Sequence, residues 1–364
     1  MKVAIVHDYL TQTGGAERVV LYMLRAFPDA PLYTSLYAPE LTFPEFADAD
    51  VRPMGHLNWS GVLRRHQRIG LPLYGRAFRS LNVDADVVIC SSSGWAHQVS
   101  TPGHKIVYCY APARWLYEPA ALFAGTPRPH ERLVGLLGPM LRSRDAAAAA
   151  SADLYLTTST LIRRRIKEVY DIDALVMPPP PALPAEGPVD PLDLDAGALL
   201  TVGRLFAYKN MEVVVRAARE SGRRLWVVGE GPDRRRLEKL GGTDVSFLGR
   251  VTDAQLRWLY QHCRALVAAA YEDFGLTPLE ANAFGRPVAA LRWGGYLDTV
   301  VEGETGVFFD RPDSGDLNRA LDRIDAGGWN PDRLRAHAAG FGEERFINRL
   351  REVAATSVGP SPVS

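Results

Sequence analysis

The feature of this sequence that most restricts its fold is a regular alternation of short apolar runs with longer amphipathic stretches. Each apolar run has the length and composition of a buried β-strand. In the first half these runs lie near Val3–His7, Ala30–Leu36, Asp86–Ser91, Lys105–Cys109, Leu154–Thr158 and Ala174–Met177. In the second half they lie near Ala198–Val202, Leu225–Val228, Val245–Leu248, Ala265–Ala269, Val288–Leu291 and Val307–Phe309. Strands that alternate with helices favour parallel sheets with helices on both faces, so we predict an α/β fold with two doubly wound sheets.

A proline-rich stretch separates the two halves. Residues 178–188 contain six prolines, which exclude a helix or a central strand there. A chain of 364 residues is also long for one core and sufficient for two. We therefore predict a first domain over residues 1–180, a linker over residues 181–195 and a second domain over residues 196–340. We also predict that residues 359–364 form a disordered tail.

A strand–glycine–helix junction in the second half carries two acidic residues. After the apolar run that ends at Ala269, the chain reads Tyr-Glu-Asp-Phe-Gly and then predicts a helix over Leu276–Phe284. A helix that begins directly after a strand-end glycine directs free backbone N–H groups at the space above the sheet, which suits phosphate or another anion. Glu272 lies on this loop, and Glu280 lies about one and a half turns inside the helix.

Five segments, in this order along the chain, resemble the motifs of one enzyme family. The stretch from Glu272 to Glu280 resembles the E-x7-E motif of retaining glycosyltransferase family 4, in its Glu-Asp-Phe-Gly form. The other segments are Val6–Leu10 followed by Gly14–Val19, Leu200–Asn210, Val227–Pro232 and Val245–Val251. The resemblance covers most of the chain and implies the GT-B architecture, in which two Rossmann-like domains face a cleft. It also implies that a final helix over residues 341–358 returns to the first domain.

The reaction that this resemblance implies moves a sugar from a nucleoside diphosphate. Negative charge develops on the departing diphosphate, and cations fixed near it stabilise that charge. Arg204 and Lys209 lie five residues apart on the loop after the strand Ala198–Val202. A guanidinium binds phosphate oxygens bidentately, and an ammonium adds a point charge. Either residue alone would more often be a solvated surface cation, but here both lie inside a family motif at a strand end.

The two glutamates have separate expected roles. Glu280 is expected to accept hydrogen bonds from the two ribose hydroxyls, because one carboxylate can take both. Glu272 is expected to contact hydroxyls of the donor sugar. The structural alternatives are a helix-capping acid for Glu272 and an exposed helical acid for Glu280. The residues expected to act in transfer are Glu272, Arg204 and Lys209. The residues expected to bind the donor are Gly14, Gly15, Gly203, Glu230, Phe274, Gly275, Leu276 and Glu280, with the glycines at 14 and 15 leaving room for the backbone to approach diphosphate and acceptor.

One position departs from the family pattern. Relatives carry a Tyr-Cys-His-Thr-Pro-x-Arg motif whose histidine reaches the donor sugar near its 6-hydroxyl, whereas this chain has Tyr-Cys-Tyr-Ala-Pro-Ala-Arg over residues 108–114. Tyr110 therefore stands where that histidine would be, and Arg114 keeps the final arginine. A phenol is larger and less basic than an imidazole. Two interpretations follow: a pocket that favours a 6-deoxy sugar or a pentose, or a shifted ring that keeps the same hydrogen bond.

No metal and no other cofactor is expected, because two cations face the diphosphate. Four Asp-x-Asp triplets begin at residues 48, 84, 171 and 193, and none follows a buried strand as a metal site would. Cys90, Cys109 and Cys263 lie inside apolar runs without metal-ligand spacing, which favours buried thiols in a reducing cytosol.

Retention of anomeric configuration by two displacements would need a carboxylate nucleophile under the sugar. The candidates are Asp8 and Glu118, but both are better explained as loop residues. The resemblance instead implies front-face transfer, in which the leaving phosphate takes the acceptor proton.

Positive charge is concentrated in one segment although the formal net charge is zero. Between Arg52 and Val83 there are six arginines and no Asp or Glu, and aromatic and aliphatic residues lie between them. Such a segment can lie on an anionic membrane surface or can be a solvated helix pair whose apolar stripe packs on the first domain. A nucleic-acid partner is not expected, because the rest of the chain is not basic enough.

We therefore predict a metal-independent retaining glycosyltransferase that uses a nucleoside-diphosphate sugar, with GDP-mannose as the first candidate. The acceptor would be a hydroxyl of a glycan, a lipid-linked intermediate or a small molecule. Two alternatives stay open: a nucleotide-sugar epimerase, for which only His7 and His104 lie suitably beside strands, and a non-catalytic nucleotide-sugar-binding subunit. The strand at the amino terminus and the lack of an apolar run of ~20 residues predict a cytoplasmic protein, with peripheral contact to the inner membrane face through residues 52–83.

Overall fold

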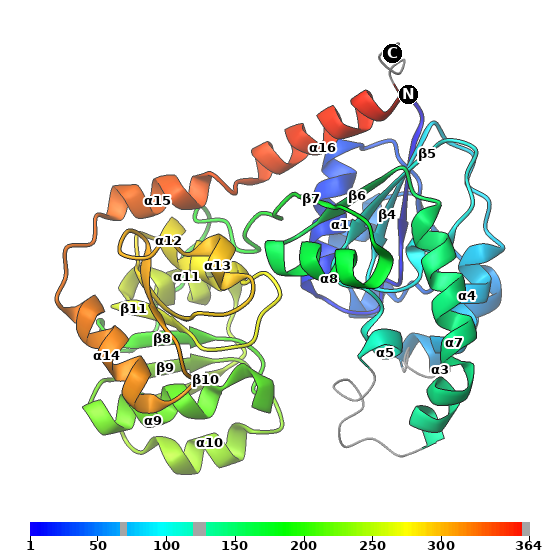
Figure 1. Ribbon diagram of the computed structural model, residues 1–364. Helices are drawn as coiled ribbons and strands as arrows, with labels where there is room; N and C mark the ends of the chain where they lie inside the picture. Colours follow the sequence, from blue (N-terminus) through cyan, green and yellow to red (C-terminus); the bar gives the residue numbers. More distant parts are fainter. Residues whose placement is uncertain (66–70, 119–128, 359–364) are drawn as a thin grey trace. The chain divides into compact units, whose positions relative to one another are not determined.

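The computed structural model describes residues 1–65, 71–118 and 129–358, so the predicted tail at 359–364 lies outside the described residues. The chain forms two compact units, each built on one parallel sheet (Figure 1). Unit 1 comprises Met1–Thr158, Ile162–Pro179 and Glu343–Ser364, and unit 2 comprises Ser159–Leu161 and Pro180–Gly342. The predicted fold class, two doubly wound α/β sheets, is confirmed.

Unit 1 holds a seven-stranded parallel sheet in the order β3-β2-β1-β4-β5-β6-β7. Its strands are β1 Val3–His7, β2 Leu32–Thr34, β3 Val51–Pro53, β4 Val87–Ser92, β5 His104–Cys109, β6 Leu154–Thr157 and β7 Leu175–Val176. Its helices are α1 Gly15–Ala26, α2 Gly55–Asn58, α3 Gly61–Arg65, α4 Leu71–Arg79, α5 Arg114–Tyr117, α7 Pro129–Ala150, α8 Thr160–Tyr170 and α16 Glu343–Val358. Within the described residues, no helix combines the length and the apolar character that crossing a bilayer requires.

Alternate residues of β1 point into two separate cores, because successive side chains of a strand face opposite sides of the sheet. Val3 and Ile5 pack in the core that α1 and α16 cover. Ala4 and Val6 pack in the core that α4 and α8 cover. The strand is buried along its whole length, as expected for a parallel sheet covered on both faces.

Helix α16 packs beside α1 on one face of the unit 1 sheet (Figure 1). The rings of Tyr22 and Phe346 meet edge to face at 6.3 Å. Arg25 donates to Glu343 at 2.6 Å, and the guanidinium of Arg351 donates to the carbonyl of Ala26 at 2.9 Å. The carboxyl-terminal helix is thus a structural part of unit 1.

Unit 2 holds a six-stranded parallel sheet in the order β10-β9-β8-β11-β12-β13, with α9 and α10 on one side and α11 and α12 on the other (Figure 1). Its strands are β8 Leu199–Val202, β9 Leu225–Val228, β10 Val245–Gly249, β11 Ala265–Ala268, β12 Val288–Leu291 and β13 Gly306–Phe309. Its helices are α9 Met211–Ser221, α10 Arg234–Gly241, α11 Asp253–His262, α12 Leu276–Ala283, α13 Tyr296–Thr299, α14 Ser314–Asp325 and α15 Pro331–Ala339. The neighbours β8 and β11 place two of the predicted site loops side by side.

A buried polar network in unit 1 has Asp145 of α7 at its centre. The hydroxyls of Tyr117 and Tyr170 donate to its Oδ2 at 3.0 and 2.7 Å, and the amide of Gln98 donates to Oδ1 at 3.3 Å. His97 Nε2 lies 3.1 Å from Oδ1. Burial by itself would raise the pKa of Asp145, but the interactions with His97, Tyr170 and Tyr117 outweigh burial and lower it.

We expect this network to stabilise the fold at neutral pH and to stop doing so in acid. Because the folded-state pKa of Asp145 lies below its unfolded value of ~3.9, the stabilisation is complete above that value and is lost as the pH falls through the folded-state pKa. Asp145→Asn should lower the free energy of unfolding by about 2–3 kcal/mol near neutral pH and by progressively less in acid. Urea unfolding of both proteins across this range measures the difference, and a difference independent of pH would contradict the expectation.

Candidate functional site

The loop after β8 carries the two predicted cations at the carboxyl edge of the unit 2 sheet. Arg204 is exposed, its guanidinium donates to the hydroxyl of Tyr208 at 3.0 Å, and it lies over the ring of Phe206 at 5.5 Å. Lys209 ends a short 3-10 turn, Ala207–Lys209, and its side chain is only 12% exposed. This loop, residues 203–210, which we call the cation loop, therefore presents one exposed cation, Arg204, and one nearly buried cation, Lys209.

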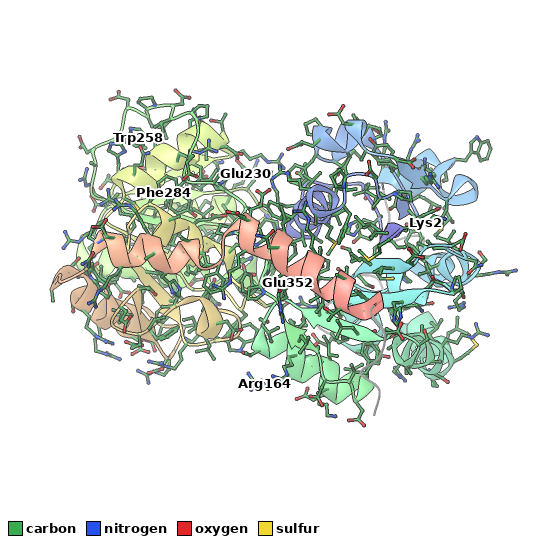
Figure 2. The ribbon with its side chains drawn as sticks, turned by 90° about the horizontal axis from the view of Figure 1, so that it is seen from above. Lys2, Arg164, Glu230, Trp258, Phe284 and Glu352 are labelled. Atoms are coloured by element: carbon green, nitrogen blue, oxygen red, sulfur yellow. The ribbon has the colours of Figure 1, made fainter. Side chains whose placement is uncertain are left out.

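Two glycines after β9 let this loop pack tightly against its neighbour. A Cβ at Gly229 would lie 2.0 Å from the carbonyl oxygen of Gly203, and a Cβ at Gly231 would lie 2.3 Å from that of Leu205. The amide of Leu205 also donates to the carbonyl of Glu230 at 2.9 Å. Glu230 itself lies on this second loop (Figure 2), where its carboxylate pairs with Arg234. Only glycine permits this backbone contact, which fixes the height of the Arg204 loop above the sheet.

Glu272 lies on the loop after β11 and meets Lys209. The ammonium of Lys209 donates to Oε1 of Glu272 in a direct ion pair. The backbone joins the same two loops, because the amide of Tyr271 donates to the carbonyl of Tyr208 at 3.3 Å. The structure thus brings the predicted cations and the predicted sugar-binding carboxylate into one site, although 63 residues separate Lys209 from Glu272.

The turn from Phe274 to Leu276 leads into α12. Gly275 precedes the helix with φ +84°, a conformation that disfavours side chains, and a Cβ there would also lie 2.5 Å from the ring of Tyr296. Phe274 is buried and Leu276 is half-buried. The backbone N–H groups at the start of α12 therefore follow directly on the Glu272 loop, which is the arrangement that binds anions or hydroxyl oxygens.

Sequence reasoning missed a pair of glycines that supports this turn. A Cβ at Gly294 would lie 2.3 Å from the carbonyl oxygen of Glu272, and a Cβ at Gly295 would lie 2.1 Å from the Cα of Phe274. The amide of Gly295 donates to the Glu272 carbonyl at 3.0 Å. The signal in the sequence was a Gly-Gly pair shortly after the apolar run of β12.

Glu280 lies inside α12 and is 5% exposed. It accepts from the hydroxyl of Tyr260 at 2.8 Å and from the backbone amides of residues 182 and 183. Burial raises the pKa of Glu280, while these hydrogen bonds act in the opposite direction. The carboxylate therefore ties the proline-rich segment to α12.

The candidates of unit 1 lie at the carboxyl edge of its own sheet. A Cβ at Gly14 would lie 2.5 Å from Oε2 of Glu17, whereas a Cβ at Gly15 would meet nothing within 4 Å. Gly14 therefore makes room for a buried carboxylate, and Gly15 borders open space. Arg114, the first residue of α5, is exposed.

Tyr110 is held in a chain of hydrogen bonds within unit 1. Its hydroxyl lies 2.9 Å from Oγ of Ser91 and donates to the carbonyl of Ala16 at 3.2 Å. Ser91 Oγ in turn lies 2.9 Å from Nδ1 of His7. This chain of hydrogen bonds joins the ends of β1, β4 and β5 to the first turn of α1, and no local sequence pattern predicts it.

Asp8 is occupied by backbone donors. Its two oxygens accept from the amides of Ser93, Trp95 and Ala96 at 2.6, 3.1 and 2.7 Å. Burial raises the pKa of Asp8, and the three amides and His7 oppose that shift. The residue fixes the loop after β4, in agreement with its interpretation as a loop residue.

In the part of the chain that the structure describes, no group of three or more His, Cys, Asp or Glu side chains could hold a metal ion. Cys90, Cys109 and Cys263 are free and buried. Burial raises the pKa of the Cys90 thiol to about 12, so it stays protonated at neutral pH.

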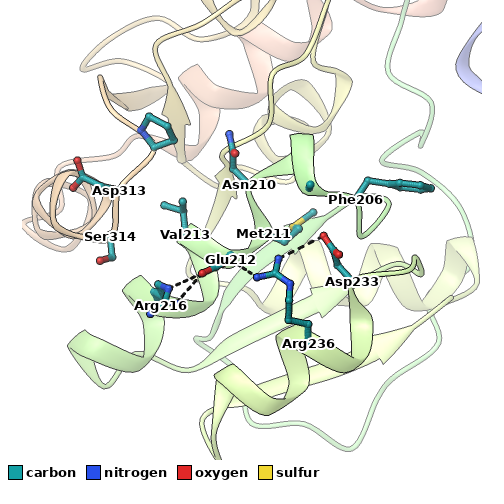
Figure 3. A pocket seen from close by; sticks show the side chains of 12 residues that line it. Phe206, Asn210, Met211, Glu212, Val213, Arg216, Asp233, Arg236, Asp313 and Ser314 are labelled. Carbon is teal, nitrogen blue, oxygen red and sulfur yellow. Dashed lines mark hydrogen bonds and ion pairs between the residues drawn. The ribbon is translucent and has the colours of Figure 1, made fainter. Parts of the chain in front are cut away.

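A separate hollow of about 410 Å³ lies on unit 2, between the beginnings of α9, α10 and α14 (Figure 3). It shares Phe206, Ala207 and Asn210 with the cation loop, but Arg204, Lys209 and Glu272 do not line it. Inside it, Glu212 pairs with Arg216 and Arg236. Because these charges neutralise one another, we place the candidate site at the strand-end loops and not in this hollow.

Comparison with known proteins identifies relatives of this chain. Residues 189–339, which lie within unit 2, match the family described as glycosyl transferases group 1. Alpha-1,3/1,6-mannosyltransferase ALG2 of Dictyostelium discoideum is 44% identical over 63 residues, which are 17% of this chain and 15% of that protein. D-inositol 3-phosphate glycosyltransferase of Acidothermus cellulolyticus is 30% identical over 226 residues, which cover 53% of this chain and 48% of that protein. The chain thus spans less than half the length of these two relatives.

Solved structures share the fold over the whole chain. Anabaena Alr3699/HepE in complex with UDP superposes with a TM-score of 0.70 at 14% identity, covering 98% of this chain and 100% of that one. Sucrose-phosphate synthase from Thermosynechococcus elongatus superposes with a TM-score of 0.68 at 19% identity, covering 98% and 99%. The two parallel-sheet units therefore have the GT-B fold.

Proposed function

We propose that this protein is a metal-independent retaining glycosyltransferase, which moves a sugar from a nucleoside-diphosphate sugar to a hydroxyl group. The observation that carries the proposal is the contact between Lys209 and Glu272, which joins a cation loop to a carboxylate loop at one sheet edge. Arg204 and Lys209 would hold the diphosphate, and Glu272 would hold hydroxyls of the sugar. Glu280 would accept hydrogen bonds from the ribose hydroxyls through the carboxylate lone pairs that Tyr260 and the two backbone amides do not use.

In the proposed reaction, the acceptor oxygen bonds to the anomeric carbon while the bond from that carbon to the phosphate oxygen breaks. The electron pair of the broken bond leaves with the diphosphate, and the acceptor proton passes to the departing phosphate oxygen. Arg204 and Lys209 stabilise the charge that develops there. Because Asp8 is committed to three backbone amides, transfer on the front face of the sugar accounts for retention without a carboxylate nucleophile.

A mannosyl donor with a guanine base is the first candidate, since one relative is a mannosyltransferase. The bound UDP in Anabaena Alr3699/HepE makes uridine the main competitor. A thermal-shift screen with UDP, GDP, dTDP and ADP tests this choice, because the nucleotide that binds most tightly raises the unfolding midpoint most.

The activity is tested by incubating the protein with a panel of nucleotide sugars without acceptor. We expect slow release of free sugar from one donor and loss of that release in Glu272→Ala. A donor that binds but releases no sugar, with or without acceptor, would indicate a binding subunit instead. Isotope exchange at carbon 2 of the donor would indicate epimerisation.

The geometry gives little support to the epimerase alternative. His7 is 2% exposed and engaged with Ser91. His104 begins β5, so it lies at the amino edge of the sheet, opposite the edge where such folds bind ligands.

Tyr110 gives a specificity prediction. If its phenol narrows the donor pocket near carbon 6, Tyr110→His should increase hydrolysis of a hexosyl donor relative to its 6-deoxy analogue. Comparing both donors on both proteins measures this ratio. An equal or better rate with the hexosyl donor in the parent chain would end the hypothesis and leave Tyr110 in the role that its bonds to Ser91 and Ala16 describe.

The acceptor belongs to the same proposal: a hydroxyl of a glycan, of a lipid-linked intermediate or of a small molecule, contacted from unit 1 near Gly15, Tyr110 and Arg114. Peripheral contact with an anionic membrane through residues 52–83 would suit the lipid-linked choice.

A further inference from the structure

The helices α3 and α4 of unit 1 carry arginines without acidic partners. From Arg52 to Val83 the sequence contains no Asp or Glu. Arg52 pairs with Asp50, just outside this segment. Arg64, Arg65 and Arg76 form no ion pair with another described side chain, and Arg65 and Arg76 are exposed. Their charge is therefore available to a partner.

A further arginine, on α7, lies close to the arginines of α4. Burial lowers the pKa of Arg79 on α4, and repulsion from Arg144 and Arg76 lowers it further. Arg144 is exposed and also has no ion pair among the described residues. Arginines from two helices thus gather without neutralisation, at a cost that a bound anion would offset.

Several arginines of unit 2 are held in ion pairs with acidic side chains. Arg223 bonds to Asp322 and Asp325, and Arg292 bonds to Asp310 and Glu302. Three other arginines of unit 2, Arg235, Arg250 and Arg333, are exposed and form no ion pair among the described residues, so what distinguishes the segment from Arg52 to Val83 is its lack of any acidic residue.

The stretch from α2 to α3 also exposes apolar side chains. Trp59 is 91% exposed, more than any other large hydrophobic residue that the structure describes, and Val62 is 60% exposed. The two lie three residues apart, and Val62 is two residues before Arg64. Arginines beside a protruding tryptophan match the boundary between lipid phosphates and acyl chains.

We propose that this part of unit 1 docks on an anionic lipid membrane, with Trp59 and Val62 entering the interface and arginines binding the lipid phosphates. The arginines of this lipid-docking surface are Arg64, Arg65, Arg76 and Arg144. RNA offers the same phosphates, and its bases can stack on Trp59, but RNA gives no reason for the exposed Val62, and the chain as a whole has no net positive charge. The inference does not depend on the transfer reaction.

Vesicle sedimentation with the full chain tests the proposal. We expect binding to phosphatidylcholine vesicles that contain phosphatidylglycerol, little binding to phosphatidylcholine alone, and release by added salt. Each arginine near an anionic surface contributes about 1 kcal/mol, so Arg64→Gln together with Arg65→Gln should weaken binding roughly tenfold to thirtyfold. The matched control, Arg319→Gln together with Arg335→Gln, removes the same charge from unit 2 and should leave binding unchanged.

A fluorescence measurement tests the apolar part separately. Lipids with brominated acyl chains should quench tryptophan emission of the parent chain, and Trp59→Phe should lose most of this quenching although six other tryptophans remain. Because Trp59 is exposed, its replacement should leave the circular dichroism spectrum intact. Equal binding to neutral and anionic vesicles, equal loss in both double variants, or preference for single-stranded RNA over vesicles would each overturn the proposal.

Discussion

Lys209→Ala is expected to lower the rate of sugar release and of transfer about 10²–10³-fold, because it removes a fixed cation from the place where the leaving diphosphate becomes charged. The change also leaves the Glu272 carboxylate without its ion-pair partner. That partner, the Lys209 side chain, is only 12% exposed in the parent chain. The loss should fall mainly on kcat, since the charge that Lys209 stabilises is larger in the transition state than in the bound donor. Initial rates with the donor that the panel identifies measure the effect.

The control for this prediction is Lys239→Ala on α10, a lysine in the same unit outside the site loops. It should keep the parent rate, and both variants should keep the parent unfolding midpoint within a few degrees. Arg204→Lys should recover part of the activity that Arg204→Ala loses, because lysine keeps the charge but not the bidentate geometry. Full turnover in Lys209→Ala would contradict the assignment of the cation loop.

Gly295→Ala is expected to destabilise unit 2 by roughly 3 kcal/mol, in the upper part of the range for overpacking. The backbone angle is not the reason, because φ at Gly295 is −69° and suits alanine. The reason is space: the new Cβ would lie 2.1 Å from the Cα and 2.2 Å from the carbonyl oxygen of Phe274. These are backbone atoms, so the Glu272–Gly275 loop itself must move.

Activity should fall together with stability, because a displacement of about 1 Å at a positioning loop can cost 10²-fold in rate. Gly315→Ala in the first turn of α14 is the matched control. Its Cβ would come no closer than 3.4 Å to a neighbour, and alanine favours a helix by about 1 kcal/mol over glycine. Urea unfolding and rates for both variants decide the matter: parent stability in Gly295→Ala would show that the loops are not packed as described.

The strands were predictable because a parallel sheet covered on both faces needs continuous apolar runs. The exception is β3, Val51–Pro53, which the sequence reasoning missed. It has three residues, is only partly buried and ends in proline at the edge of the sheet, so it lacks an apolar signature. Short edge strands depend on a neighbour for their conformation, and the neighbour is not visible in the local sequence.

The residues of the candidate site could be predicted from the sequence where they belong to motifs at strand ends. Arg204, Lys209 and Glu272 could be assigned because neighbouring strand ends share one sheet edge. The role of Gly294 and Gly295 could not, since it arises from the close approach of another loop. The burial of Glu280 against Tyr260 and the network around Asp145 also depend on tertiary packing, which local pattern does not encode.

The most direct test of the account is a solved complex with the nucleoside diphosphate that gives the largest thermal shift. We expect the β-phosphate to lie within hydrogen-bonding distance of Arg204 or Lys209 and the ribose to lie near Glu280. A diphosphate bound in the hollow between the beginnings of α9, α10 and α14, or anywhere without contact to Arg204 or Lys209, would contradict the proposed donor site.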